Sequence, residues 1–409
     1  MSGNGRNGLS ERLQTPISTA ELERRWRLIR AAMKREKIDV LLMQNNNDHM
    51  GGYVKYFTDM PATNGYPMTV VFPQDDEMTV VMQGAFGSDG RPPADTWHGV
   101  KRMLHTPSYA SAHYTQGYDP ELAIKGLQPY AKATIGFVGI YQMSFAMGDT
   151  VMRAFPKARF VDASELVDRV KVIKSAEELE LVKRCALMQD GAMKAAFAAV
   201  KPGMRDTEVA AVAVHYSQVH GSENGIYLCA SMPADQSSAI GLQPTKFGQR
   251  HMQNRTIQKG DAIALLVEDS GPGGMFTELG RTCVVGMKVP QQMKDELEFV
   301  KESRKMTLDM LKPGTPCKDI WEAFNAFMRK NGRPEEARLY CHGQGYDLVE
   351  RPLIRSDETW TIQKDMNIVV HPTYAYAGYI NWLCDNYIIG GNGPGDRIHQ
   401  YPEQIDEVG

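Results

Sequence analysis

The stretch TIQKGDAIALLVED (residues 256–269) recurs later in the chain as TIQKDMNIVVHPTY (361–374), and both copies lead from a turn into a buried strand. A second pair of segments precedes them. VKPGMRDTEVAAV (200–212) and LKPGTPCKDIWEAF (311–324) each join one helix to the next through a Lys-Pro-Gly turn. Two similar halves in the same order predict an internal duplication whose strands share one sheet covered by helices. A pocket at the centre of that sheet would be lined by both halves.

The residues before these repeats carry the signals of a separate domain. Ser18 and Glu21 form a capping-box pattern that opens a helix over 18–39. The other elements expected here are a strand at 40–44, a hairpin at 68–82, strands at 134–140 and 158–164, and a helix at 148–156. A long amphipathic helix then begins after Ser175, with Glu178 as its box partner. We therefore predict an α+β protein with a mixed α/β domain over 1–168 and a second domain over 169–409.

Composition narrows the class of protein. The chain has 409 residues, which fits two domains, and its formal net charge of -3 comes without a basic block, so nucleic acid is not an expected partner. The polar start and the absence of a long apolar run predict no membrane contact. The cysteines show no CxxC spacing, which is typical of free buried thiols in a reducing compartment, so we expect a cytoplasmic protein.

Several motifs together resemble the creatinase and aminopeptidase P superfamily, whose catalytic domain is the pita-bread fold. They are IKSAEEL (173–179), KGD (259–261), ELGRT (278–282), HGQGYDLVERP (342–352) and DNYII (385–389), in this order. The resemblance implies a creatinase-like N-terminal domain followed by a pita-bread domain with pseudo-twofold symmetry. It also implies a homodimer in which the partner's N-terminal domain lies near the active site.

The superfamily's metallopeptidases bind two metal ions with two aspartates, one histidine and two glutamates, and few of these are kept here. The resemblance places Glu278 at the second aspartate and His342 at the histidine. His371 falls at the first glutamate and Cys384 at the last. The first aspartate falls on Val267, Glu268 or Asp269, depending on a gap.

A histidine and a thiol do not bridge two cations as carboxylates do, so we predict that the dinuclear centre is lost. The function expected first is a metal-independent, creatinase-like hydrolase of a C–N bond in a small guanidino, ureido or betaine-like molecule. His342, His371 and His251 would exchange protons in this reaction. Further substrate contacts are expected from Glu278, Glu350, Arg281 and Tyr374.

Two alternatives remain open from the sequence. One is a metal-dependent pita-bread enzyme, either an Xaa-Pro-type peptidase or a lyase acting on a sulfonium acid. It would hold one divalent ion of iron, manganese or zinc, with ligands among Glu268, Glu278, His342, His371 and Asp385. The other is a binding module that kept the fold without chemistry.

Overall fold

The computed structural model describes residues 17–50, 52–61, 63–236, 254–372, 374–376 and 379–409. The chain divides into two compact units, Met1–Lys171 and Val172–Gly409. Among the described residues, no helix combines the length and apolar character that a bilayer crossing requires.

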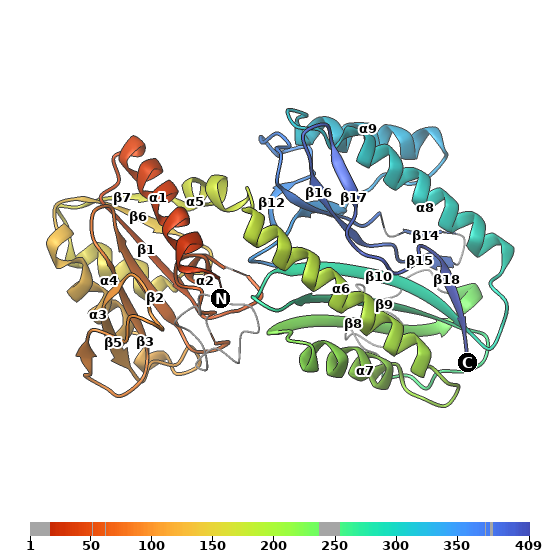
Figure 1. The fold of residues 1–409 in the computed structure, drawn as a ribbon, viewed down its shortest axis with the longest axis horizontal. Coiled ribbons are helices and arrows are strands. Elements are labelled where there is room, and N and C mark those ends of the chain that lie inside the picture. The colour runs from red at the N-terminus through yellow and green to blue at the C-terminus, as the bar shows by residue number, and fades with distance from the viewer. Residues whose placement is uncertain (1–16, 51, 62, 237–253, 373, 377–378) are drawn as a thin grey trace, which may run out of the picture. The chain divides into compact units, whose positions relative to one another are not determined.

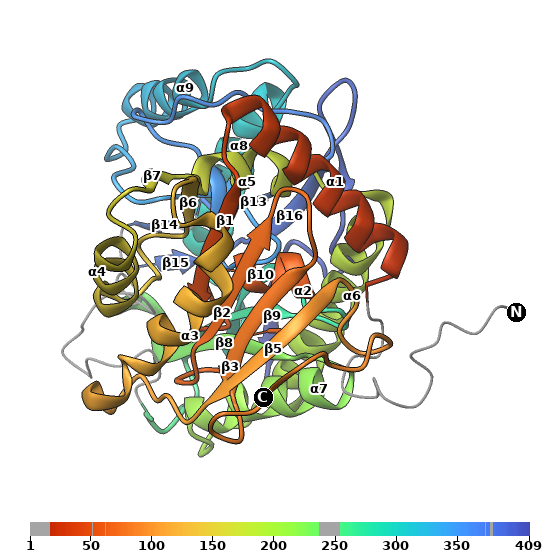
Figure 2. The ribbon, with the colours of Figure 1, turned by 90° about the vertical axis from the view of Figure 1, so that its left-hand side faces the viewer.

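The first unit is a seven-stranded sheet with helices packed on it, and Figure 2 shows strands of this sheet. Its strand order is β4-β5-β3-β2-β1-β6-β7. The strands are β1 (Val40–Asn45), β2 (Met68–Pro73), β3 (Met78–Gln83), β4 (Asp89–Gly90), β5 (Val100–Thr106), β6 (Thr134–Val138) and β7 (Arg159–Asp162). The helices are α1 (Thr19–Glu36), α2 (Tyr53–Thr58), α3 (Tyr118–Leu127), α4 (Phe145–Ala154) and α5 (Ser164–Lys171).

The predicted elements of this unit are confirmed. The Ser18 side chain accepts a hydrogen bond from the Glu21 backbone N–H at the start of α1. β2 and β3 form the expected antiparallel hairpin, in which Thr69 pairs with Val81. The strongest local signals, caps and alternating apolar residues around a turn, therefore decide these elements.

The second unit repeats one arrangement twice (Figure 1). Its first half contains α6 (Ala176–Ala199), α7 (Asp206–Val219), β8 (Asn224–Pro233), β9 (Asp261–Ser270) and β10 (Phe276–Val285). Its second half contains α8 (Gln291–Met310), α9 (Cys317–Lys330), β11 (Cys341–Gly343), β12 (Glu350–Leu353), β13 (Asn367–Val370), β14 (Tyr374–Tyr376), β15 (Tyr379–Asn381), β16 (Asp385–Ile389), β17 (Pro394–Arg397) and β18 (Ile405–Val408).

The backbone hydrogen bonds of the two Lys-Pro-Gly turns show the duplication directly. The Gly203 N–H donates to the Ile257 carbonyl at 2.8 Å, and the Gly314 N–H donates to the Ile362 carbonyl at 2.8 Å. Both glycines have positive φ, 95° and 93°, which side chains disfavour. The predicted duplication is therefore confirmed, down to the turn that precedes each buried strand.

β14 and β15 pair as a small two-stranded sheet, and the other described strands of the two halves form two larger sheets instead of the single sheet predicted from the sequence. One has the order β18-β10-β9-β8 and the other β12-β11-β13-β16-β17. They meet at an isolated antiparallel bridge between Gly280 and Cys384. A Cβ at Gly280 would lie 2.8 Å from the Trp382 ring and 2.9 Å from the Cys384 sulfur, so only glycine permits this approach.

Helices cover the outer faces of both sheets (Figure 1). α6 and α7 enclose an apolar core with β8, β9 and β10, while α8 and α9 enclose another with β11, β13 and β16. The inner faces are therefore left to line a site between the halves of this unit.

Candidate active site

Two glutamates face each other across the β9–β10 hairpin. Glu268 pairs directly with Glu278 in the antiparallel register. Their neighbours Val267 and Leu279 belong to the core beneath α6 and α7. Because successive side chains of a strand point to opposite faces, both glutamates lie on the inner face of the sheet. The register thus selects Glu268 among the three residues that the sequence left open.

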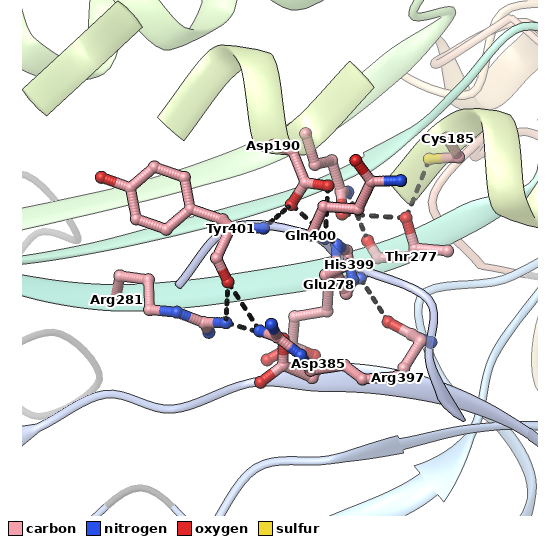
Figure 3. Close-up of polar contacts among 12 residues, drawn as sticks. Cys185, Asp190, Thr277, Glu278, Arg281, Asp385, Arg397, His399, Gln400 and Tyr401 are labelled. Atoms are coloured by element: carbon pink, nitrogen blue, oxygen red, sulfur yellow. Dashed lines mark hydrogen bonds and ion pairs between the residues drawn. The ribbon is translucent and has the colours of Figure 1, made fainter. Parts of the chain in front are cut away.

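The side chain of Asp269, the residue after Glu268, points to the outer face of the sheet. Its carboxylate accepts hydrogen bonds from the Gln189 amide of α6 at 2.7 Å and from the Tyr227 hydroxyl at 2.7 Å. The same Gln189 amide donates to the Thr277 carbonyl at 2.7 Å, and the Thr277 hydroxyl reaches Cys185 (Figure 3). Burial raises the pKa of Asp269. This carboxylate therefore ties the hairpin to its covering helix and does not enter the site.

Glu278, His342 and His371 form a cluster on the inner face. One potential ligand atom from each lies within 4.8 Å of the others. They come from β10, β11 and the residue that follows β13, and the two imidazole centroids are 5.2 Å apart at 71°. The His371 backbone N–H donates to the Tyr340 carbonyl at 2.8 Å, which fixes this strand end beside β11. The fold thus gathers three residues that are far apart in the sequence.

Both imidazoles are held in their neutral form. Burial lowers the pKa of His342 to about 4, and burial together with His342 lowers that of His371 well below its usual value. The His342 Nδ1 lies 2.8 Å from the Gly343 carbonyl, which can only accept, so Nδ1 carries the proton and Nε2 a lone pair. The His371 Nε2 is buried and has no hydrogen-bond partner among the described residues. Such an orphaned nitrogen is typical of a ligand-binding position.

Buried amides connect the two glutamates. The Asn386 Oδ1 accepts from the Glu278 backbone N–H at 2.8 Å, so its Nδ2 donates to the Gln344 Oε1 at 2.9 Å. The Gln344 Nε2 must then donate to Glu268, at 3.0 Å. Burial raises the pKa of both carboxyls, and the negative charge of Glu278 raises that of Glu268 further. Sequence reasoning missed Gln344 and Asn386, although both lie inside the quoted HGQG and DN motifs.

Arg281 and Asp385 belong to a structural ion cluster, and this corrects their predicted roles. The five N–H groups of Arg281 make five hydrogen bonds, one to Asp385 at 2.8 Å and the others to the carbonyls of Gly280, Cys384, Tyr401 and Pro402. Figure 3 shows Arg281 together with Asp385 and Tyr401. No donor of Arg281 remains for a substrate.

Asp385 also pairs with Arg304 at 2.6 Å and Arg397 at 3.2 Å. Burial alone would raise the pKa of Asp385, but the arginines lower it. Asp385 therefore neutralises arginines, and it is not part of the Glu278–His342–His371 cluster.

Glu350 is likewise engaged by the protein. Its carboxylate accepts from the Lys174 ammonium at 2.6 Å and from the Tyr346 backbone N–H at 2.8 Å, in a fully buried pair. The structure thus gives Glu350 a structural role in place of the predicted substrate contact.

Two other predicted site residues have no outcome in the structure. Tyr374 lies in β14, but its side chain and the whole of His251 lie outside the described residues.

The donor set fits one metal ion better than two. Cys384, at the position of a bridging glutamate, hydrogen-bonds the Glu278 carboxyl through its thiol. Glu268 is held by Gln344 and is not part of the three-donor group. Two imidazoles and one carboxylate are a known ligand set for a single catalytic zinc or iron ion. The neutral imidazoles agree with that use, and so does the Nε2 of His371, which has no hydrogen-bond partner in the part of the chain that the structure describes.

Comparison with known proteins identifies the family. Residues 180–400 match the model of the metallopeptidase family M24, which is more than half of the chain, and the chain belongs to this family. An uncharacterised hydrolase/peptidase of Sinorhizobium fredii is 26% identical over 344 residues, covering 81% of this chain and 82% of that protein. A creatinase of a Bacillus species is 23% identical over 383 residues, covering 88% and 83%.

The solved structures agree on the fold. The crystal structure of an X-Pro aminopeptidase from Thermotoga maritima superposes with a TM-score of 0.77 at 16% identity, over 94% of this chain and 99% of that one. The predicted resemblance to the creatinase and aminopeptidase P superfamily and the pita-bread architecture are confirmed. The relatives are named as hydrolases and peptidases, which supports an enzyme.

Proposed function

We propose that this member of the metallopeptidase family M24 is a hydrolase that binds one divalent metal ion through Glu278, His342 and His371 and cleaves a C–N bond in a small polar molecule. The observation that carries the proposal is the cluster itself: its three ligand atoms lie within 4.8 Å of one another, and it includes His371, whose Nε2 no described residue hydrogen-bonds. This proposal reverses the preference drawn from the sequence, which put the metal-independent reaction first.

The residues around the cluster suit hydrolysis. A divalent ion held there would supply Lewis-acid polarisation of a carbonyl and lower the pKa of a bound water. Glu268 lies on the same inner face as Glu278, and the Gln344 amide orients its carboxyl. It can take a proton from the attacking water and return it to the leaving amine. An apolar wall that includes Leu266 and Trp382 keeps bulk water from one side.

A second candidate is the metal-independent C–N hydrolase. It is supported by His371 and Cys384, which stand where the superfamily's metallopeptidases carry bridging glutamates, and by the similarity to a creatinase. Because burial lowers the pKa of His342 to about 4 and lowers that of His371, both imidazoles are neutral bases at neutral pH, and neither is an imidazolium that could act as the acid. The proton for the leaving amine would then come from a carboxyl group, Glu278 or Glu268, whose pKa values are raised.

Metal content separates the two candidates. The protein is purified without added metal, incubated with Fe²⁺, Mn²⁺ or Zn²⁺, freed of loose ions by gel filtration, and measured by inductively coupled plasma mass spectrometry. We expect about one ion per chain, lost in His371→Ala and His342→Ala because each removes one of only three ligands. His215→Ala, which changes an exposed histidine of α7, is the control and should retain the ion.

Activity is then followed as amine release from Xaa-Pro dipeptides and from guanidino and ureido acids, with and without chelator. Turnover that survives complete metal removal would favour the second candidate. Equal metal content in the wild type and both cluster variants would contradict the proposed ligands.

A further inference from the structure

The sulfur of Cys384 lies on the inner face of β10, the face that carries Glu278. Cys384 and Gly280 pair across the junction of the two sheets and exchange backbone N–H to carbonyl hydrogen bonds at 3.2 and 3.3 Å. A Cβ at Gly280 would lie 2.9 Å from the Cys384 sulfur, so the sulfur lies on the side to which a residue at 280 would point. Glu278 points to that same side because it is two residues away on the strand. Cys384 and Glu278 are therefore diagonal neighbours on one face.

The two residues after Cys384 agree with this orientation. The Asp385 carboxylate turns to the opposite side, where it pairs with Arg281 and Arg304. The Asn386 side chain turns back to the inner face, where its Oδ1 accepts from the Glu278 backbone N–H at 2.8 Å. Because side chains alternate along an extended chain, Cys384 and Asn386 share the inner face. Glu278 is thus bounded by this segment on two sides, at its backbone and at its side chain.

The Cys384 thiol hydrogen-bonds the Glu278 carboxyl and is the donor. Burial raises the pKa of Glu278 to about 7, and this hydrogen bond acts in the opposite direction. A hydrogen bond that lowers the pKa of a carboxyl group favours the ionised form, which can only accept, so the proton comes from the sulfur. Cys384 is not part of the group of three close donors, Glu278, His342 and His371. The thiol therefore contacts one proposed ligand without joining the set.

Packing fixes the position of the thiol. Cys384 is fully buried and belongs to an apolar cluster with Leu266 and Trp382. The Trp382 ring would lie 2.8 Å from a Cβ at Gly280, so the ring and the sulfur both use the space that this glycine leaves. A donor that cannot move constrains the direction of the carboxylate that it contacts.

We infer that Cys384 is a positioning residue of the proposed metal centre, whose thiol holds the Glu278 carboxylate toward His342 and His371. The inference rests on the proposed function and deepens it, because it makes the metal affinity depend on a residue that is not a ligand. Hydrogen bonds to a ligating group from such outer residues typically change metal affinity by about 10- to 100-fold when they are removed.

Zinc affinity tests the inference without any substrate. The full-length protein is freed of metal, and the dissociation constant for Zn²⁺ is measured at pH 7.5 by competition with a chromophoric chelator. We expect Cys384→Ala to weaken zinc binding by about 10- to 100-fold, because the carboxylate loses its donor. Cys384→Ser should stay close to the wild type, because a hydroxyl also donates to a carboxylate.

Cys283→Ala is the matched control. Cys283 is a fully buried thiol of the same strand, β10, but it belongs to the apolar core beneath α6 and α7. Its removal leaves a cavity of the same kind and should leave the zinc affinity unchanged. Thermal unfolding of each metal-free variant checks that it is folded. The absorption spectrum of the wild type loaded with Co²⁺ is recorded as well, and we expect no sulfur-to-cobalt charge-transfer band, because the thiol is not a ligand.

Wild-type zinc affinity in Cys384→Ala, or a loss in Cys384→Ser as large as that in Cys384→Ala, would overturn the inference. A sulfur-to-cobalt band that disappears in Cys384→Ser would overturn it too, by making Cys384 a direct ligand. All three outcomes require a wild type that binds metal, so they leave the proposed metal centre standing. A wild type that binds no Zn²⁺ would contradict the proposed function itself, and the inference would fail with it.

Discussion

Replacing Asp385 by asparagine tests whether this residue is a structural counter-charge for buried arginines or a metal ligand. The substitution keeps the size of the side chain and removes its charge. In the wild type, Asp385 is fully buried and accepts from Arg281 at 2.8 Å and from Arg304 at 2.6 Å, two side chains that are themselves 1% and 5% exposed. The variant leaves these guanidinium groups buried without their shared counter-charge.

The expected loss follows from those two bonds. A hydrogen bond to a charged group contributes about 1.5 to 3 kcal/mol, and breaking a buried ion pair from one side costs about 3 to 5 kcal/mol. An asparagine oxygen can still accept one bond, and Glu403 still contacts Arg304 at 2.6 Å. We therefore expect Asp385→Asn to lower the free energy of unfolding by about 3 to 5 kcal/mol.

The loss should also depend on pH in a defined direction. The arginines lower the pKa of Asp385 in the folded protein. The stabilisation is therefore fully present above the unfolded pKa of about 3.9 and lost as the pH falls through the lower folded value. The difference between wild type and variant should be constant from about pH 5 to 8 and shrink below about pH 4.

Urea unfolding, followed by circular dichroism and tryptophan fluorescence, measures the loss, with separate transitions fitted if the two units unfold independently. Asp309→Asn is the control, because that carboxylate is 62% exposed and pairs with Lys305 on the surface of α8, where the effect should stay below about 1 kcal/mol. A loss below about 1 kcal/mol in Asp385→Asn, together with loss of bound metal, would refute the structural assignment and make Asp385 a ligand.

Three further outcomes follow from other parts of the molecule. Burial raises the pKa of Asp119 to about 6, so the neutral carboxyl stabilises the folded protein below about pH 4, and this stabilisation is lost as the pH rises through 6. Relative to the wild type, Asp119→Asn should raise the free energy of unfolding by up to about 3 kcal/mol at pH 7.5 and leave it unchanged at pH 4, as measured by urea unfolding at both values. Lys174→Met should lower the free energy of unfolding by about 3 to 5 kcal/mol, because it leaves Glu350 buried without its partner. Lys183→Met breaks an exposed pair and should lower it by less than about 1 kcal/mol, so similar losses in the two variants would contradict the burial argument. A divalent ion at a hundred times its dissociation constant should raise the free energy of unfolding by about 2.7 kcal/mol, and EDTA should reverse this in a thermal melt; an unchanged melt would mean that the folded state binds no ion.

Local signals allowed much of the fold to be predicted. At the start of α6, the Ser175 hydroxyl accepts from the Glu178 backbone N–H at 3.1 Å and the Glu178 carboxylate accepts from the Ser175 N–H at 2.6 Å, as the sequence pattern indicated. The duplicated turns were recognisable because Gly203 and Gly314 occupy the same left-handed position in each half. Such features depend on residues a few positions apart, so the sequence contains all the information they need.

The site was only partly predictable. Motif positions brought out Glu278, His342 and His371, and the structure gathers these three. The same motifs suggested substrate contacts for Arg281 and Glu350, which the fold uses internally instead. The identity of a charged residue in a motif does not show whether its side chain contacts the substrate or a buried counter-charge. Only the partners of that side chain in the folded structure distinguish the two roles.

The sequence alone predicted the two similar halves, the turn and buried strand that each of them repeats, and the three residue types of the cluster. Tertiary structure alone decided that Glu268 and not Asp269 faces Glu278, because a shift of one residue in strand register moves every side chain to the other face. Hydrogen-bond register and long-range charge pairing join segments that are distant in the chain, so they become fixed only when the two halves pack together.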